Sequence, residues 1–175
     1  MPTHRAVRQL RPATIRPVRD TDRAELGRFF EENDRPQVTR QFHPFPLDAQ
    51  SAAKIVNPRW RDRFYVGTAG DPAHIVAFCM LRGWDEGYEV PSFGIMIDRR
   101  VYGHGLGRQM TEFAITEAAR LGSTHVRLTV YASNGPAVHL YASLGFAEVE
   151  RHDVTVDGEP DVRLTMMKRV GGRGR

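Results

Sequence analysis

The spacing of apolar residues predicts a helix over residues 106–121. Apolar side chains recur there at steps of four, three, one, four and three: Leu106, Met110, Phe113, Ala114, Ala118 and Leu121. This spacing gathers them on one helix face, and Gly122 suits the position after the last turn, where φ is often positive. Between residues 126 and 130, apolar and polar side chains alternate instead, which predicts a strand.

Similar patterns divide the rest of the chain into strands and helices. Further strands are expected at 14–18, 63–68, 75–81, 88–97, 146–149 and 162–167, and further helices at 20–30, 48–60 and 134–144. Gly70-Asp71-Pro72 and Asp157-Gly158 should turn two hairpins, and Pro91 and Gly94 should bend or bulge the strand that contains them. The order of elements predicts an α/β domain with a mixed sheet and at least one parallel crossover, around residues 93–131.

The length of the chain supports one compact domain. A chain of 175 residues can bury a sizeable core but is short for two domains of ordinary size. We place the domain at residues 14–169. It follows a polar, arginine-rich leader at 1–13, which we expect to be flexible, and precedes a flexible glycine-rich tail at 170–175.

The charge balance suits a small polyanionic ligand. The chain has 25 Lys and Arg residues against 21 Asp and Glu, and most of the basic residues are arginine. Arginine favours planar contacts with phosphate and carboxylate groups. Because the basic residues are scattered along the chain and their one dense cluster lies in the tail, we expect no nucleic-acid partner.

Cysteine usage and hydropathy indicate a cytoplasmic protein. Cys79 is the only cysteine, and it lies within the apolar run 75–81, which favours a buried thiol over a nucleophile. The N-terminus lacks the apolar stretch of a signal peptide, and no run approaches the roughly 18 apolar residues of a membrane span. We therefore expect no membrane partner.

The segment 34–47 has no helical or strand period. It contains Phe42, His43, Pro44, Phe45 and Pro46 in succession. Aromatic side chains on a loop near a helix often line a substrate pocket, and they equally often anchor the loop to the core. Both interpretations stay open for this segment.

A glycine-rich turn predicts a phosphate site. Gly103, Gly105 and Gly107 lie between an expected strand and the helix at 106–121. Such glycines let the backbone approach a ligand closely, and a helix start offers unpaired N–H groups and partial positive charge. A Walker loop is excluded because Leu106 follows Gly105, and a dinucleotide fold is disfavoured because Arg108 replaces its third glycine and no acidic residue follows at 123–130.

A second motif lies on the next expected helix. It reads Asn134-x-x-Ala137-x-x-Leu140-Tyr141-x-x-x-Gly145-Phe146. Together with the glycine turn, this resembles the GNAT superfamily of N-acetyltransferases over about residues 14–169. Aligning the family's loop, Arg/Gln-x-x-Gly-x-Gly/Ala, on Gly105 and Gly107 puts Tyr102 where Arg or Gln is usual, whereas a shifted register matches Arg100, Gly103 and Gly105. We prefer the first register because it keeps Leu106 on the apolar face of its helix.

This resemblance implies a twisted mixed sheet of about seven strands with about four helices, and acetyl-CoA as co-substrate. The pantetheine arm would lie between two splayed central strands and bond the backbone near Ile95 and Ile97, with Gly94 as a bulge that exposes these groups. The other residues that the resemblance assigns to the cofactor are Tyr102, Gly103, His104, Gly105, Leu106, Gly107, Arg108 and Asn134.

The resemblance further implies direct attack of an amine on the thioester, with Tyr141 as general acid for the departing thiolate and Glu89 as the nearest candidate base. A solvated turn with ordinary carboxylates is the alternative that we slightly prefer for the cluster around Glu89. No metal site is expected, because the seven histidines show no ligand spacing.

The acceptor is the least constrained part of the prediction. We expect the primary amine of a small molecule, such as an amino sugar or an aminoglycoside-like compound. Protein or peptide N-acetylation is the first alternative, and a non-catalytic acyl-CoA sensor is an alternative of another class. The oligomeric state is open, with a homodimer as one option.

Overall fold

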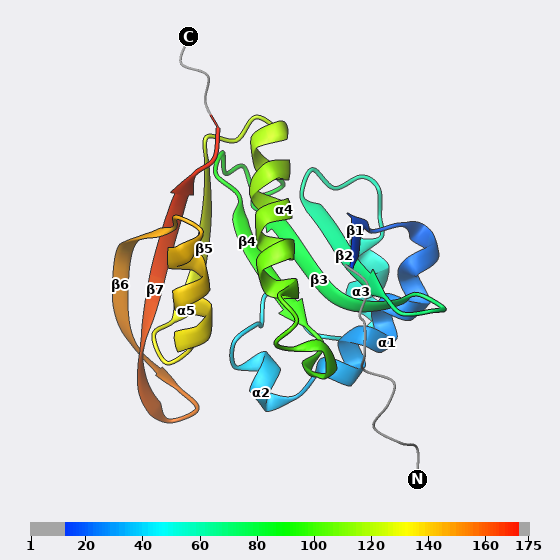
Figure 1. The fold of residues 1–175 in the computed structure, drawn as a ribbon, viewed down its shortest axis with the longest axis horizontal. Coiled ribbons are helices and arrows are strands. Elements are labelled where there is room, and N and C mark those ends of the chain that lie inside the picture. Colours follow the sequence, from blue (N-terminus) through cyan, green and yellow to red (C-terminus); the bar gives the residue numbers. More distant parts are fainter. Residues whose placement is uncertain (1–12, 172–175) are drawn as a thin grey trace.

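The computed structural model describes residues 13–171, and its seven strands form one mixed sheet (Figure 1). The strands are β1 (Thr14–Pro17), β2 (Arg63–Ala69), β3 (His74–Arg82), β4 (Ser92–Ile97), β5 (His125–Tyr131), β6 (Ala147–Val156) and β7 (Glu159–Arg169). The helices are α1 (Arg23–Asn33), α2 (Pro36–Thr39), α3 (Ala49–Ile55), α4 (Leu106–Arg120) and α5 (Gly135–Ser143), with short 3₁₀ turns η1 (Asp20–Asp22) and η2 (Arg99–Val101). Nearly all of the predicted leader, and residues 172–175 of the predicted tail, lie outside the described residues.

The sheet has the order β1-β2-β3-β4-β5-β7-β6, and its neighbours are antiparallel except for β4 and β5. Helix α4 connects these two parallel strands, which confirms the predicted α/β domain and its crossover. Residues 34–47 are not entirely irregular, because α2 forms within them. The helix expected at 48–60 starts as predicted, with Asp48 accepting from the Ser51 amide at 2.7 Å, but ends at Ile55.

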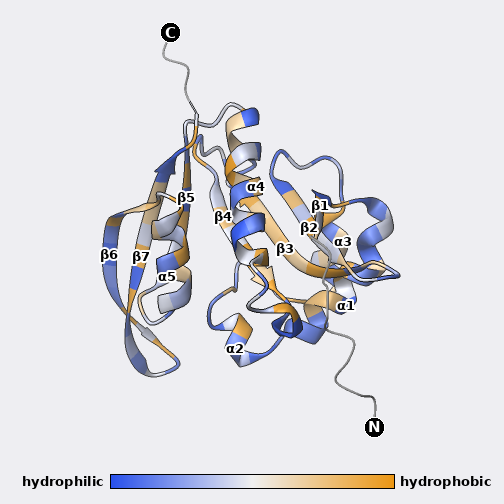
Figure 2. Ribbon diagram, viewed as in Figure 1, coloured by the Kyte–Doolittle hydropathy of each residue, from blue (hydrophilic) through white to orange (hydrophobic). Residues whose placement is uncertain are grey.

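Two hydrophobic cores lie on opposite faces of the sheet. Successive residues of β3 alternate between them: Ala77, Cys79 and Leu81 pack in the core with α4 and α5, whereas Phe78 and Met80 pack in the core with α1 and α3. The alternation follows from the two-residue period of a strand. Figure 2 shows the hydrophobic character of β3 and the more hydrophilic outer hairpin of β6 and β7. The Cys79 thiol is fully buried, as its apolar surroundings predicted.

Strands β4 and β5 separate soon after they meet. Within the described residues their register contains a single pair, Ser92 with Arg127, whereas β3 and β4 pair continuously at six positions. The backbone of β4 beyond Ser92 therefore faces β5 without a continuous ladder. This separation was expected from the family resemblance.

Two details of the expected strand 88–97 were wrong. The strand begins only at Ser92. Pro91 has no N–H to donate to a neighbouring strand, and the Tyr88 amide closes a turn by donating to the Gly83 carbonyl at 2.8 Å. Gly94 forms no bulge against β3, since the register runs through it without a shift. Glycine leaves room here for its neighbours: a Cβ on Gly94 would lie 2.5 Å from the Met80 methyl carbon and 3.2 Å from the Phe42 ring, so both side chains would have to shift.

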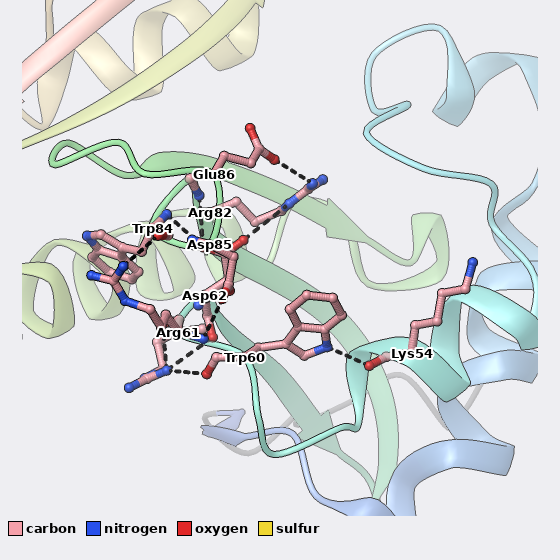
Figure 3. A network of polar contacts seen from close by, with 10 residues as sticks. Lys54, Trp60, Arg61, Asp62, Arg82, Trp84, Asp85 and Glu86 are labelled. Carbon is pink, nitrogen blue, oxygen red and sulfur yellow. Dashed lines mark hydrogen bonds and ion pairs between the residues drawn. The ribbon is translucent and has the colours of Figure 1, made fainter.

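A buried carboxylate joins the start of β2 to the loop that leads into β4 (Figure 3). One oxygen of Asp62 accepts from the amides of Gly83 and Trp84, both at 2.9 Å, and from that of Asp85 at 3.3 Å. In return, a carboxylate oxygen of Asp85 accepts from the Asp62 amide at 2.8 Å. Asp62 is 6% exposed and its bond from the Gly83 amide is buried, so this donor has few other partners within reach.

We expect Asp62→Ala to lower the free energy of unfolding by about 2–3 kcal/mol, because the buried amide of Gly83 and the part-buried amides of Trp84 and Asp85 lose their acceptor. Urea unfolding followed by circular dichroism measures the loss. Glu86→Ala is the matched control, since Glu86 pairs with Arg82 at 3.2 Å in the same network but is exposed and should cost less than about 1 kcal/mol. Equal losses in the two variants would show that the Asp62 bonds do not stabilise the loop.

Candidate active site

A cleft of about 560 Å³ lies along the separated part of β4. It is bordered by residues from the segment after α1, from β4 and β5, from the glycine turn and from α5. The predicted site residues that line it are Ile95, Ile97, Tyr102, Gly103, Gly105, Leu106, Gly107, Asn134 and Tyr141. The fold therefore brings most of the predicted site together.

The glycine turn presents an open backbone at one part of this cleft. Gly103 and Gly105 have φ of 80° and 77°, and no atom lies within 4 Å of a Cβ built on either. Gly105 is the N-cap of α4, and the first amide of the helix to bond backward is that of Gln109, which donates to the Gly105 carbonyl at 3.1 Å. The amides of residues 106–108 precede it, and the first turn carries no acidic residue. This end of α4 can bind an anion.

Two residues predicted to contact the cofactor have other partners for their side chains. The Arg108 guanidinium donates to the Ser143 hydroxyl at 2.7 Å and pairs with Glu112 at 3.5 Å, so it connects α4 to α5. The His104 Nδ1 lies 3.0 Å from the Tyr102 carbonyl oxygen and closes the turn on itself. Neither side chain lines the cleft, although both backbones belong to the turn.

The two registers of the loop motif differ in their geometry. Arg100 donates to Glu32 at 3.0 Å and pairs with Asp98, and it does not line the cleft. Tyr102, Gly105 and Gly107 all line it. Gly103 of the other register also lines the cleft, so the two registers differ in their first residue: Tyr102 borders the cleft, and Arg100 does not.

Tyr141 lies on α5 with its ring held between two phenylalanines. The ring centroids of Phe93 and Phe146 are 6.4 and 5.9 Å away, and Tyr141 is 8% exposed. Burial raises the pKa of its hydroxyl to about 12. Within the described chain, no side-chain hydrogen bond engages this hydroxyl, and Tyr141 lines the cleft. The phenol is thus protonated at neutral pH and available as a donor.

Asn134 fixes the start of the same helix. Its side-chain oxygen accepts from the Ala137 amide at 3.4 Å, as the sequence predicted for an N-cap. Its side-chain nitrogen lies 3.4 Å from the Gln41 side-chain oxygen. Asn134 therefore places α5 and also joins it to the segment after α2.

The motifs in this geometry coincide with a known family. A sequence profile of the Acetyltransferase (GNAT) family matches residues 25–146. This chain belongs to the GNAT acetyltransferase family. The resemblance inferred from the sequence, and the seven-stranded fold that it implied, are confirmed.

Curated relatives align with parts of this GNAT chain. Mycothiol acetyltransferase of Corynebacterium kroppenstedtii is 47% identical over 58 residues, which are 33% of this chain and 16% of that protein. The [Ribosomal protein bS18]-alanine N-acetyltransferase of Escherichia coli (strain K12) is 38% identical over 76 residues, 42% of this chain and 51% of that protein. The chain thus spans about half or less of the length of these relatives.

Solved structures share the whole fold. Ribosomal-protein-S5-alanine acetyltransferase from Vibrio fischeri has a TM-score of 0.78 at 10% identity and covers 95% of this chain and 98% of its own. Spermidine N-acetyltransferase from Vibrio cholerae, solved in complex with CoA and spermine, has a TM-score of 0.75 at 18% identity, covering 91% and 96%. At these identities the likeness shows the GNAT fold alone.

The structure does not bring Glu89 to the cleft of this GNAT domain. Glu89 is exposed on the loop between β3 and β4, and Asp and Glu are absent from the cleft lining formed by residues 13–171. Its proposed role as base therefore has no geometric support. The interpretation as a solvated turn describes its surroundings better.

The segment 34–47 supplies the cleft residues that the motifs missed. Gln37, Gln41, Phe42 and His43 all border the cleft. Phe42 is 7% exposed and packs against Phe78, with ring centroids 6.4 Å apart, so both interpretations of this aromatic segment apply to it. The aromatic cluster in the sequence was the available signal for this wall.

Proposed function

We propose that this GNAT protein transfers an acetyl group from acetyl-CoA to the primary amine of a small molecule. The observation that carries the proposal is the cleft itself. It combines the stretch of β4 that does not pair with β5, the open glycine turn and the buried phenol of Tyr141. Membership of an acetyltransferase family supports the same activity.

The residues of the cleft fit acetyl-CoA. The amides at the start of α4 and the open space above Gly103 and Gly105 suit its pyrophosphate. The backbone of β4 around Ile95 and Ile97 can pair with the pantetheine amides as an added strand would. Bound in this way, acetyl-CoA supplies an activated acetyl thioester.

Tyr141 acts as general acid in this proposal. The amine nitrogen forms a bond to the acetyl carbon while the C–S bond breaks, and the sulfur takes the phenol proton. Since a free thiol has a pKa of about 8.5, a phenol with a pKa of about 12 gives up its proton uphill. After the attack, the acylated nitrogen carries one proton more than the amide product. Tyr141 takes this proton, so the phenol is protonated again at the end of the cycle.

The contacts around the cleft mouth support a small acceptor. Arg40, just after α2, pairs with Asp157 at 3.7 Å and Asp161 at 3.8 Å on the β6–β7 hairpin. Gln41 contacts Asn134 at the start of α5, so the segment after α2 is joined both to this hairpin and to α5. Such cross-connections leave less room for a large acceptor, and we therefore favour a small one. Peptide N-termini are the second candidate acceptor, favoured by the 38% identity to the bS18-alanine N-acetyltransferase.

An acetyl-CoA thiol-release screen tests the proposal. Amino sugars, aminoglycosides, polyamines and peptides are offered in parallel, and acetylated products are identified by mass spectrometry. We expect release to depend on at least one amino-sugar or aminoglycoside acceptor. Release with peptides alone would replace the acceptor class. If acetyl-CoA binds but no acceptor causes release, the protein is a sensor and the proposed activity is wrong.

A further inference from the structure

The cleft lining contains an imidazole, a group that can accept a proton from an acceptor amine. Among the cleft residues of the described chain, the titratable side chains are His43, Tyr102 and Tyr141. Tyr141 is used as the acid, and Tyr102 belongs to the glycine turn. His43 comes from the opposite wall, in the segment between α2 and α3.

Hydrogen bonding fixes which nitrogen of His43 is basic. Nδ1 lies 3.0 Å from the carbonyl oxygen of Thr39. A carbonyl can only accept, so Nδ1 carries the hydrogen in this bond, and Nε2 of the neutral ring keeps its lone pair. Histidine in this form is the side chain most often used as a general base.

The exposed ring of His43 has two contacts, the bond to Thr39 and a ring pair with Tyr131. It stacks on Tyr131, the last residue of β5, at 14° with centroids 6.5 Å apart. The neighbouring residues Arg40 and Gln41 hold the same segment to the β6–β7 hairpin and to Asn134. His43 is thereby placed on the cleft wall by contacts to the other half of the sheet.

We infer that His43 is the general base that prepares the acceptor amine, an inference that rests on the proposed acetyltransferase function. Nε2 takes one proton from the acceptor ammonium, and the neutral nitrogen then attacks the acetyl carbon. The imidazolium afterwards releases that proton to water. The second proton lost by the nitrogen replaces the one that Tyr141 gives to the sulfur, so both protons are accounted for.

Charged and titratable groups surround His43 on two sides. Arg40, Tyr131 and Asp157 border one hollow with it, and Asp34 and Asp48 border another. Arg40 and Asp157 pair with each other at 3.7 Å, so their opposite charges partly cancel at the ring. Among residues 13–171, neither hollow places a carboxylate in the cleft lining, so His43 is the basic side chain that the lining offers.

His43→Asn tests the inference, because asparagine can still donate to the Thr39 carbonyl but has no basic nitrogen. With the best acceptor from the screen, we expect kcat/KM for the amine to fall about tenfold near pH 7. The ratio of wild type to variant should approach one at a pH where the amine is already neutral. Acetyl-CoA affinity, measured by calorimetry, should stay within about twofold of wild type. His139→Asn, on the exposed face of α5, is the matched control.

The pH profile separates a base from a structural role. A loss of the same size at every pH would show that His43 only positions the wall, and wild-type activity in His43→Asn would also overturn the inference. Added imidazole should partly restore His43→Ala, and failure to do so while acetyl-CoA still binds would count against the base. An inactive wild type would instead overturn the proposed function itself.

Discussion

Replacing Tyr141 by phenylalanine is expected to lower kcat for acetyl transfer by about 10²–10⁴-fold, the range for a lost general acid. Acetyl-CoA affinity should change little, because the ring keeps its packing against Phe93 and Phe146. Steady-state kinetics and calorimetry with acetyl-CoA measure the two quantities. Since the pKa of the hydroxyl is raised to about 12, wild-type kcat should show no loss from phenol ionisation below about pH 10.

Tyr65→Phe is the matched control for this prediction. Tyr65 is also buried, but its hydroxyl donates to Glu117 at 3.2 Å on α4, away from the cleft. The same deletion of one oxygen there should reduce stability and leave kcat nearly unchanged. Full activity of Tyr141→Phe would remove this phenol from the mechanism, and the acid would then have to be sought among Tyr102, His43 and solvent.

The helix ends of the C-terminal half could be predicted because their signals are local. Asn134 caps α5 through a bond to an amide three residues on, and Gly122 and Gly145 have φ of 89° and 85° where α4 and α5 end. Each of these features depends on a few neighbouring residues. Two of these positions, Asn134 and Gly145, belong to the motif that pointed to the family.

The separation of β4 from β5 could not be derived from periodicity. Both strands are apolar enough to pair along their whole length, and whether they do is decided by tertiary packing. The start of β4 was predicted too early for a related reason: Tyr88 and Val90 before Pro91 favour a strand by type, but the chain forms a turn at Tyr88. The resemblance to a family, not the pattern of residues, supplied the open strand.

The wall containing His43 was the part of the site with the weakest sequence signal. The run from Phe42 to Pro46 has no period, and α2 has four residues, too few for a helical pattern to show. The position of His43 depends on contacts with Tyr131 and, through Arg40, with the β6–β7 hairpin, which lie far along the chain. Glu89 was selected for its proximity in sequence, and long-range packing places it on the surface instead.

A negative charge placed in the glycine turn is expected to have a large effect on acetyl-CoA affinity. Gly105→Asp is expected to weaken acetyl-CoA binding about 100-fold relative to Gly105→Asn, because a carboxylate at the helix start would lie against the pyrophosphate. Two like charges about 4 Å apart repel by about 4 kcal/mol at an effective dielectric of 20, and by less where water enters. Both side chains tolerate the φ of 77° at this position, and a Cβ there meets no atom within 4 Å. Calorimetric titration with acetyl-CoA measures the difference.

The comparison of these two variants isolates charge, because aspartate and asparagine have nearly the same shape. The difference in affinity should shrink at high salt, since the repelling groups are near solvent. It should also disappear with acetyl-pantetheine, which lacks the pyrophosphate. Equal affinities of both variants for acetyl-CoA at low salt would mean that the anion lies elsewhere, and that the amides at the start of α4 do not hold it.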